Sequence, residues 1–206
     1  MRRYVFVAIN RDKWRRMRKN VHIPVRKCLK TLPKSDIACY TSNGNCYCSQ
    51  KGVLYMARVY DVANWFLSKE KMTHKKLQKL CYYAQAWSYA LKDKPLIDAE
   101  FQAWVHGPVC PQLYEQYKGS GMMDLTADPR SHFDFSSNEE ELLESVWETY
   151  GSLTGNALEV LTHSEPPWRN ARAGCAENQI CQNVISSEDM KKYYKSIYIG
   201  DTESDA

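Results

Sequence analysis

Hydrophobic residues recur at helical spacing along most of the chain after residue 56. A helix that contacts a core on one side carries apolar residues at positions i, i+3, i+4 and i+7. The first segment with this spacing contains Val59, Val62, Ala63, Phe66 and Leu67. We therefore expect the folded unit to open with a helix near Val59, and helical patterning continues to about Ile197.

The most regular helical segment covers residues 74–92. Its apolar stripe consists of Leu77, Leu80, Cys81, Ala84, Trp87 and Leu91. Thr73 precedes the segment and is suited to cap it. Lys75, Lys76 and Lys79 lie away from the stripe, so we expect a core helix with a solvated lysine-rich face. A basic docking helix is the alternative interpretation.

The rest of the chain predicts short helices and a few extended pieces. Residues 95–97 and 101–105 are typical of short strands, and Pro111 suits the first turn of a helix over 112–118. Further helices are expected after Ser136 or Ser137, after Thr154 and from Ser187. Glu139, Glu140 and Glu141 form an acidic first turn that favours a helix N-terminus rather than a metal site. The predicted fold is mainly α, a compact helical domain with a minor short β element.

Charge divides the chain into two parts. Residues 1–55 contain 13 Lys and Arg but 2 Asp and Glu, a net charge of +11. The remaining residues contain 15 Lys and Arg and 22 Asp and Glu, a net charge of −7. The net charge of the 206 residues is therefore +4. A basic character therefore belongs to the first part alone.

The same division predicts the domain organisation. Residues 1–55 show no sustained helical or alternating period, so we expect a basic N-terminal extension that is disordered or belongs to an over-extended reading frame. Lys51-Gly52 are encoded by a purine run that resembles a bacterial ribosome-binding site ahead of Met56. A flexible arm that contacts nucleic acid through its positive charge is the alternative. Residues 56–200 are the expected domain, and 201–206 an acidic tail.

Composition argues against several other classes of protein. The longest apolar run near the start, residues 4–9, is too short for a membrane span or a secretory signal, so we expect a cytoplasmic protein with no membrane partner. In that compartment cysteines are mostly reduced. The Cys46-x-Cys48 pair lacks the paired knuckles of structural zinc sites, and we expect no metal and no cofactor.

Two motifs place a histidine and a tryptophan beside Gly or Pro. One runs over residues 103–109, with Trp104, His106, Gly107 and Pro108, and the other over 162–169, with His163, Pro166, Pro167, Trp168 and Arg169. Gly and Pro restrict the backbone, so such segments present side chains in a fixed geometry. One interpretation is structural: His163 ends a helix, the prolines stop it, and Trp168 covers the core. The other is a surface that receives a partner, because Trp and Arg often dominate interfaces.

Catalysis is the weaker interpretation of these motifs. A catalytic pair of Cys110 with His106 or His163 would lack a residue to orient the histidine. The sequence also has no glycine-rich phosphate-binding loop, no serine nucleophile elbow and no His-Glu-x-x-His motif. We therefore expect no enzyme. A hydrolase or transferase that uses His106 and His163 remains the alternative, and it requires the two side chains to meet in a pocket.

Taken together, the motifs resemble the Panacea domain family, also called SocA-like, which includes phage-associated GepA-type proteins. The resemblance rests on residues 59–67, 72–80 and 82–87, on Ala103-Trp104 with Gly107-Pro108-Val109, on Leu113-Tyr114, on Leu161-Thr162-His163 with Pro167-Trp168 and Ala171-Arg172, and on 187–194. These motifs cover almost all of residues 57–197. Members of this family typically begin just before the first motif, which agrees with a start at Met56.

The resemblance implies an antitoxin of a bacterial or prophage toxin–antitoxin system. Such a protein neutralises a cognate toxin by direct binding, and one branch resembles an adaptor that delivers its toxin to a bacterial protease. The family supplies no catalytic residues, and the toxin's identity does not carry over. An acidic domain favours encounter with a basic toxin. The residues that we expect to contact the partner are Trp104, His106, Gly107, Pro108, His163, Trp168, Arg169 and Arg172.

Overall fold

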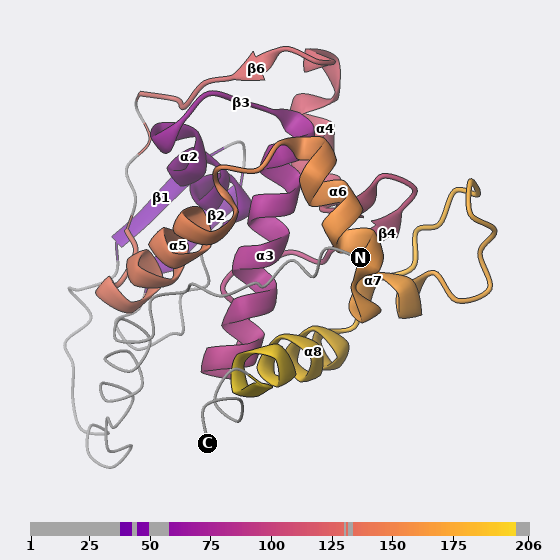
Figure 1. Cartoon of the computed structure of the whole chain (residues 1–206). Coiled ribbons are helices and arrows are strands. Elements are labelled where there is room, and N and C mark those ends of the chain that lie inside the picture. The colour runs from indigo at the N-terminus through magenta and orange to yellow at the C-terminus, as the bar shows by residue number, and fades with distance from the viewer. Residues whose placement is uncertain (1–37, 43–44, 50–57, 130, 132–133, 201–206) are drawn as a thin grey trace.

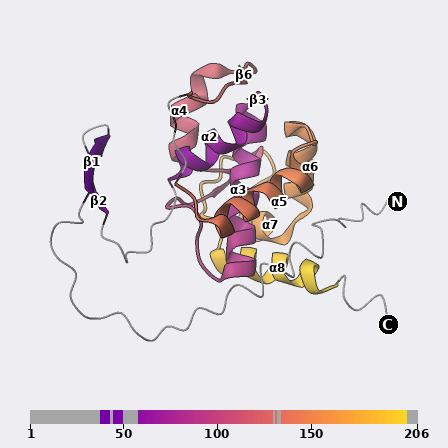
Figure 2. The ribbon, with the colours of Figure 1, turned by 90° about the vertical axis from the view of Figure 1, so that its left-hand side faces the viewer.

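The computed structural model of the chain describes residues 38–42, 45–49, 58–129, 131 and 134–200. A single helix, α3 (His74–Lys92), runs through the middle of the helical body. It contacts α2, α5, α6 and α8, and the two ribbon views show these helices arranged around it (Figure 1, Figure 2). The expectation of a mainly α fold is confirmed. The helices around α3 are α2 (Val59–Lys69), α4 (Pro111–Tyr117), α5 (Ser137–Tyr150), α6 (Gly155–Ser164), α7 (Pro166–Ala171) and α8 (Ser187–Gly200), with a 3-10 turn, η1 (Lys118–Ser120).

The strands are short and form antiparallel pairs, which agrees with the predicted minor β element. The pairs are β1 (Ala38–Ser42) with β2 (Asn45–Ser49), β3 (Met72–Thr73) with β6 (Asp124–Leu125), and β4 (Gln102–Trp104) with β5 (Gly107–Val109). The chain ahead of α8 runs beside β4, where the Ala103 amide donates to the Asn183 carbonyl at 2.9 Å. The β1–β2 hairpin was not predicted. The rest of residues 1–57, including Met56, and the tail 201–206 lie outside the described residues.

Helix starts follow the predicted caps. Thr73 Oγ1 accepts from the Lys76 amide, Thr154 Oγ1 accepts from the Ala157 amide, and Ser136 forms a capping box. Side-chain acceptors of this kind satisfy amides that have no partner inside the helix. The proline pair acts differently from the expectation: α6 does end at Ser164, but Pro166 then occupies the first turn of a new helix, α7, where proline is well tolerated.

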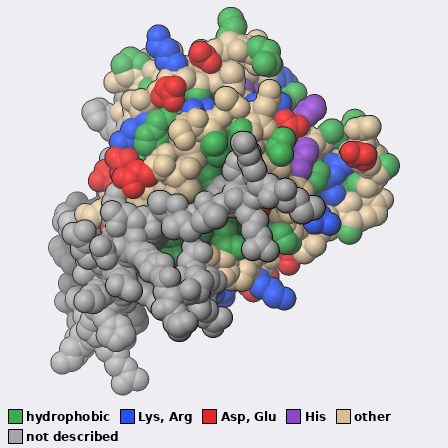
Figure 3. Space-filling view, viewed as in Figure 1, with side chains coloured by type: hydrophobic (Ala, Val, Ile, Leu, Met, Phe, Trp, Pro, Cys, Tyr) green, Lys and Arg blue, Asp and Glu red, His purple; other side chains and the backbone are tan. Residues whose placement is uncertain are grey.

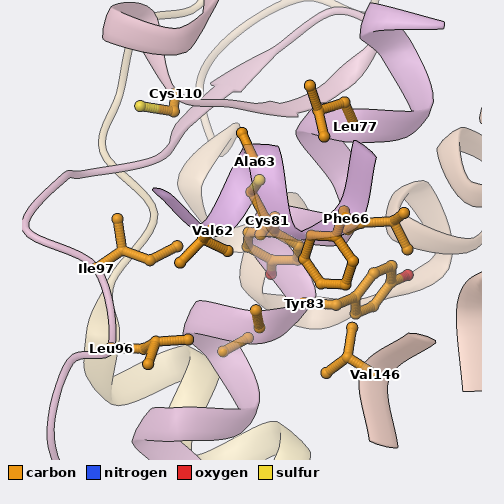
Figure 4. Close-up of a cluster of buried hydrophobic side chains, with 14 of the residues drawn as sticks. Val62, Ala63, Phe66, Leu77, Cys81, Tyr83, Leu96, Ile97, Cys110 and Val146 are labelled. Carbon is orange, nitrogen blue, oxygen red and sulfur yellow. The ribbon is translucent and has the colours of Figure 1, made fainter. Parts of the chain in front are cut away.

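The core is built around α3, in which every residue from Leu77 to Ser88 is buried (Figure 4). Side chains from α2, α5 and the loop at Leu96 and Ile97 surround it. The predicted solvated lysine face is therefore wrong for Lys79, whose exposed fraction is 1%. The reason is architectural: a helix that is packed on several sides has no outward face along its buried turns.

No helix in the described part of the chain combines the length and the apolar character needed to cross a membrane.

Candidate functional site

The first of the two motifs forms the turn between β4 and β5, which packs against α3 and α6. Gly107 begins β5 with φ +91°, a conformation that side chains rarely adopt. A Cβ on Gly107 would also lie 2.8 Å from Lys79 Cε and 2.8 Å from Thr162 Oγ1. Glycine is therefore required here both for the backbone conformation and for the close approach of two neighbouring side chains.

Lys79 lies directly beneath this turn. Its Nζ donates a hydrogen bond to the Pro108 carbonyl at 3.0 Å. Burial lowers the pKa of Lys79 to about 7, although Glu159 acts to raise it. Burial favours the uncharged amine because a cation loses its hydration in a nonpolar interior.

Gln78 fixes the end of the same turn. Its Oε1 accepts from the Cys110 amide at 2.8 Å, and its Nε2 donates to the Cys110 carbonyl at 3.2 Å. The side-chain amide thus satisfies both backbone groups of one residue, as a neighbouring strand would do. Consecutive residues of α3 therefore bind this part of the chain at two points, Pro108 in the 103–109 motif and Cys110 directly after it.

A network of charged side chains lies at the surface above Lys79. The exposed His106 donates from Nδ1 to Glu159 Oε1 at 2.8 Å, and Lys75 Nζ contacts Glu159 Oε2 at 2.5 Å. Burial acts to raise the pKa of Glu159, but the hydrogen bonds from Lys75 and His106 outweigh it and lower that pKa. Glu159 therefore joins the β4–β5 turn to the first turn of α3.

The second motif stacks its aromatic rings. The rings of His163 and Trp168 are 4.0 Å apart and nearly parallel, at 15°. Trp168 Nε1 donates to the Trp104 carbonyl at 3.1 Å, which ties the second motif to the first. Burial lowers the pKa of His163, and its Nε2 is buried without a hydrogen-bond partner among the described residues. Trp168 is partly buried and packs against the core, as the structural interpretation of the second motif expects.

Arg172 has a structural position, and the expectation that its side chain is available to a partner is wrong. Its exposed fraction is 6%. Nη1 donates to the Ala103 carbonyl at 2.9 Å, and the guanidinium also stacks over Trp168. The two hydrogens of Nη2 are shared among three carbonyls of the loop that follows α7, those of Ala176, Glu177 and Gln179. A guanidinium offers five donors in a rigid plane, so one arginine can organise a whole loop.

A cavity of about 290 Å³ opens beside the β4–β5 turn. Aromatic and aliphatic side chains form most of its wall, and the Trp104 ring packs edge-on against Tyr114 at 4.8 Å. A concave, mostly apolar pocket with a few polar groups is the usual form of a binding site. The lining residues are His74, Lys75, Gln78, Lys79, Trp104, Val105, His106, Val109, Tyr114, Gly121, Met122, Ile180 and Cys181.

Apolar side chains are exposed around this region. Met122 and Ile180 at the cavity have exposed fractions of 83% and 81%, and Val160 on α6 has 71%. Arg169 on α7 is also exposed. Figure 3 shows histidine, acidic, basic and hydrophobic side chains close together over α6 and α7. We call the set His106, Glu159, Val160 and Arg169 the α6 face.

The two predicted histidines differ in their position relative to the cavity. No hydrogen bond joins His106 to His163 in the described structure, and only His106 lines the cavity. Cys81, Cys110, Cys175 and Cys181 are free thiols. Within the described ranges, no group of His, Cys, Asp and Glu is arranged to hold a metal ion. A hydrolase or transferase that uses both histidines requires them to meet in a pocket, and His106 and His163 do not meet in this cavity.

Sequence reasoning did not identify Lys79, Gln78 and Glu159 as members of this site. Lys79 and Gln78 lie outside the apolar stripe of this helix, and their burial is decided by the elements packed against α3. One signal was present: the motif at 72–80 includes both residues.

Replacing Lys79 with methionine should change the pH dependence of stability. Between pH 7 and 10.5 the unfolded chain keeps the Lys79 proton and the folded chain loses it, so the free energy of unfolding rises with pH, by about 3–5 kcal/mol. We expect Lys79→Met to lose this rise in urea titrations at several pH values. Burial also lowers the pKa of Lys92, to about 8, so Lys92 adds a smaller rise in the free energy of unfolding with pH. Lys92→Met is therefore the control, and it should keep the larger share of the rise, which comes from Lys79. Equal slopes in Lys79→Met and the unaltered chain would contradict the prediction.

Comparison with known proteins agrees with the motifs. Residues 77–169 match the family model described as "Antitoxin SocA-like, Panacea domain". The chain is 28% identical over 151 residues to Antitoxin SocA from Caulobacter vibrioides (strain NA1000 / CB15N), across 60% of this chain and 78% of that protein. No solved structure matches the chain. The resemblance to the SocA-like Panacea family is therefore confirmed over residues 77–169.

Proposed function

We propose that this chain is an antitoxin that neutralises a protein toxin by direct binding through the α6 face and the adjoining cavity. The observation that carries the proposal is the concentration of exposed apolar and charged side chains around the family motifs, beside a cavity with an aromatic wall. Exposed apolar groups beside polar ones are typical of protein-binding surfaces. The 103–109 and 162–169 motifs meet there, joined by the hydrogen bond from Trp168 to the Trp104 carbonyl.

The rigidity of the site supports the same proposal. Gln78, Lys79 and Arg172 hold the backbone of the β4–β5 turn from beneath. A surface that is ordered before binding loses less entropy when a partner arrives. Catalysis is not needed for neutralisation of this kind, and the proposal assigns none.

The first test is co-expression with each open reading frame beside the gene. We expect one neighbour to stop growth alone and to be harmless with this chain. Absence of a toxic neighbour, or a toxic neighbour that this chain does not counteract, would overturn the proposal.

The α6 face is tested separately with Val160→Arg, His106→Ala and Arg169→Ala. We expect at least one of them to weaken toxin binding about tenfold or more in calorimetry, because a few central residues carry most interface energy. Lys195→Ala, an exposed residue of α8, is the matched control and should bind normally. Full affinity in all three variants, with intact folding by circular dichroism, would reject this face but leave the antitoxin role.

Delivery of the toxin to a protease is the second form of the mechanism. Direct inhibition leaves the toxin's half-life unchanged in cells that express this chain, whereas an adaptor shortens it. A pulse-chase measurement of toxin abundance distinguishes them.

A further inference from the structure

Two thiols approach each other closely in the loop between α7 and α8. The Cys175 thiol donates a hydrogen bond to Cys181 Sγ, and the two sulfur atoms are 2.6 Å apart. A covalent S–S bond is about 2.05 Å long. The two sulfurs therefore need to move only slightly to form a bond.

The backbone between the two cysteines is already ordered. The Arg172 guanidinium binds three of its carbonyls, at 2.8 to 3.0 Å. Gln179 Oε1 accepts from the Ala176 amide, and the Gln179 backbone amide donates to the Ala176 carbonyl. Closing a ring through this loop requires little additional ordering, and conformational entropy is the main resistance to ring closure.

Accessibility separates Cys175 from Cys81, Cys110 and Cys181, which are buried. Cys81 and Cys110 have exposed fractions of 0%. Cys175 is partly exposed, in a loop that extends away from the helical body (Figure 1). A small oxidant can therefore reach Cys175 without local unfolding, and Cys181 is placed behind it to complete the reaction.

We propose that Cys175 and Cys181 are an oxidation site, at which a small disulfide such as glutathione disulfide converts the two thiols into an intramolecular disulfide. The Cys175 thiolate attacks one sulfur of the oxidant, forms a mixed disulfide and releases one glutathione. The Cys181 thiolate then attacks Cys175 Sγ and releases the second glutathione. The pair loses two electrons and two protons, and the oxidant is reduced to two thiols.

The cross-link has a local consequence at the cavity. It closes a ring that contains Ile180, and both Ile180 and Cys181 line the cavity. Oxidation therefore restrains the part of the cavity wall that the loop supplies. The oxidation site itself does not depend on the proposed antitoxin function.

The test uses the full chain, treated with glutathione disulfide at mildly alkaline pH, because the thiolate is the attacking species and the hydrogen bond to Cys181 raises the pKa of Cys175. Free thiols are then blocked with N-ethylmaleimide under denaturing conditions, and the chain is digested with trypsin. Residues 173–191 form one tryptic peptide with both cysteines and no other. We expect this peptide to lose all maleimide label and to be lighter by two hydrogen atoms than the reduced peptide. The peptide 80–92, with Cys81, should stay labelled.

Each of the two cysteines can be replaced separately. In Cys175→Ser and Cys181→Ser the remaining cysteine should carry glutathione or the label, with no internal cross-link. Glutamyl endopeptidase provides a second readout, since cleavage after the exposed Glu177 leaves the two halves joined only if the disulfide is present. Three results after treatment with glutathione disulfide would each overturn the proposal. They are a 173–191 peptide with two maleimide labels, the same peptide with two glutathiones, and a disulfide-linked dimer of chains.

Discussion

Gly107→Ala is expected to destabilise the folded chain by about 3–5 kcal/mol, measured as the free energy of unfolding in urea. Two effects combine. An alanine at φ +91° is strained by roughly 1–3 kcal/mol. Its Cβ would also overlap Lys79 Cε and Thr162 Oγ1 at 2.8 Å, and overpacking of a tightly filled site costs about 1–3 kcal/mol.

The overlap cannot be relieved cheaply. Lys79 is held by its bond to the Pro108 carbonyl, and Thr162 donates to the Glu159 carbonyl at 2.9 Å. Movement of either side chain breaks a buried hydrogen bond, and an unsatisfied buried donor is itself destabilising. We therefore expect the turn to lose its position on α3, which would also weaken toxin binding if the proposed function is correct.

The chain contains a matched control for this substitution. Gly174 has φ +88°, almost the same as Gly107, but no atom lies within 4 Å of the Cβ position. Gly174→Ala therefore reports the backbone strain alone, and we expect a loss of about 1–3 kcal/mol. Equal destabilisation by the two substitutions would show that the contact with Lys79 and Thr162 does not contribute.

Patterns that depend on neighbours along the chain were predictable. Thr73, Ser136 and Thr154 cap the helices that follow them, and Pro111 begins α4. These signals are local because a cap acts within one turn of its own helix. The helical class followed from the same kind of information, summed along the chain.

Features that depend on packing were not predictable. Lys79 looked solvated because the apolar stripe of α3 was expected to be its only buried side. Arg172 looked available because nothing near it in the sequence shows that it binds the carbonyls of Ala103 and of the following loop. Burial of a charged group is decided by contacts between distant segments, which hydrophobic periodicity does not report.

Glu165 is another charged residue whose burial depends on segments distant in the sequence. It lies between α6 and α7, with an exposed fraction of 3%. Tyr194, 29 positions later, donates to its Oε2 at 2.6 Å, and Tyr83 donates to its Oε1 at 3.3 Å. Burial raises the pKa of Glu165 to about 8, while the bonds from Tyr194 and Tyr83 act to lower it.

Glu165→Gln should remove a loss of stability that the unaltered chain undergoes as pH rises. Between pH 4.5 and about 8 the folded chain keeps the Glu165 proton and the unfolded chain releases it. The folded state then binds more protons, so the free energy of unfolding falls with increasing pH, on the order of 3–5 kcal/mol over this range. His74 and His163, whose pKa values burial lowers, act in the opposite direction, so the difference between variant and unaltered chain is the quantity to compare.

Glutamine keeps an oxygen that accepts from Tyr194 and Tyr83, but it has no proton to lose in this range. We therefore expect the variant to match the unaltered chain near pH 4.5 and to be more stable by about 3–5 kcal/mol near pH 8. Glu140→Gln, at an exposed position of α5, controls for removal of a carboxylate and should leave the pH profile unchanged. If Glu165→Gln follows the unaltered chain at every pH, Glu165 is ionised in the folded protein at neutral pH, and the tyrosine hydroxyls stabilise its charge more strongly than burial opposes it.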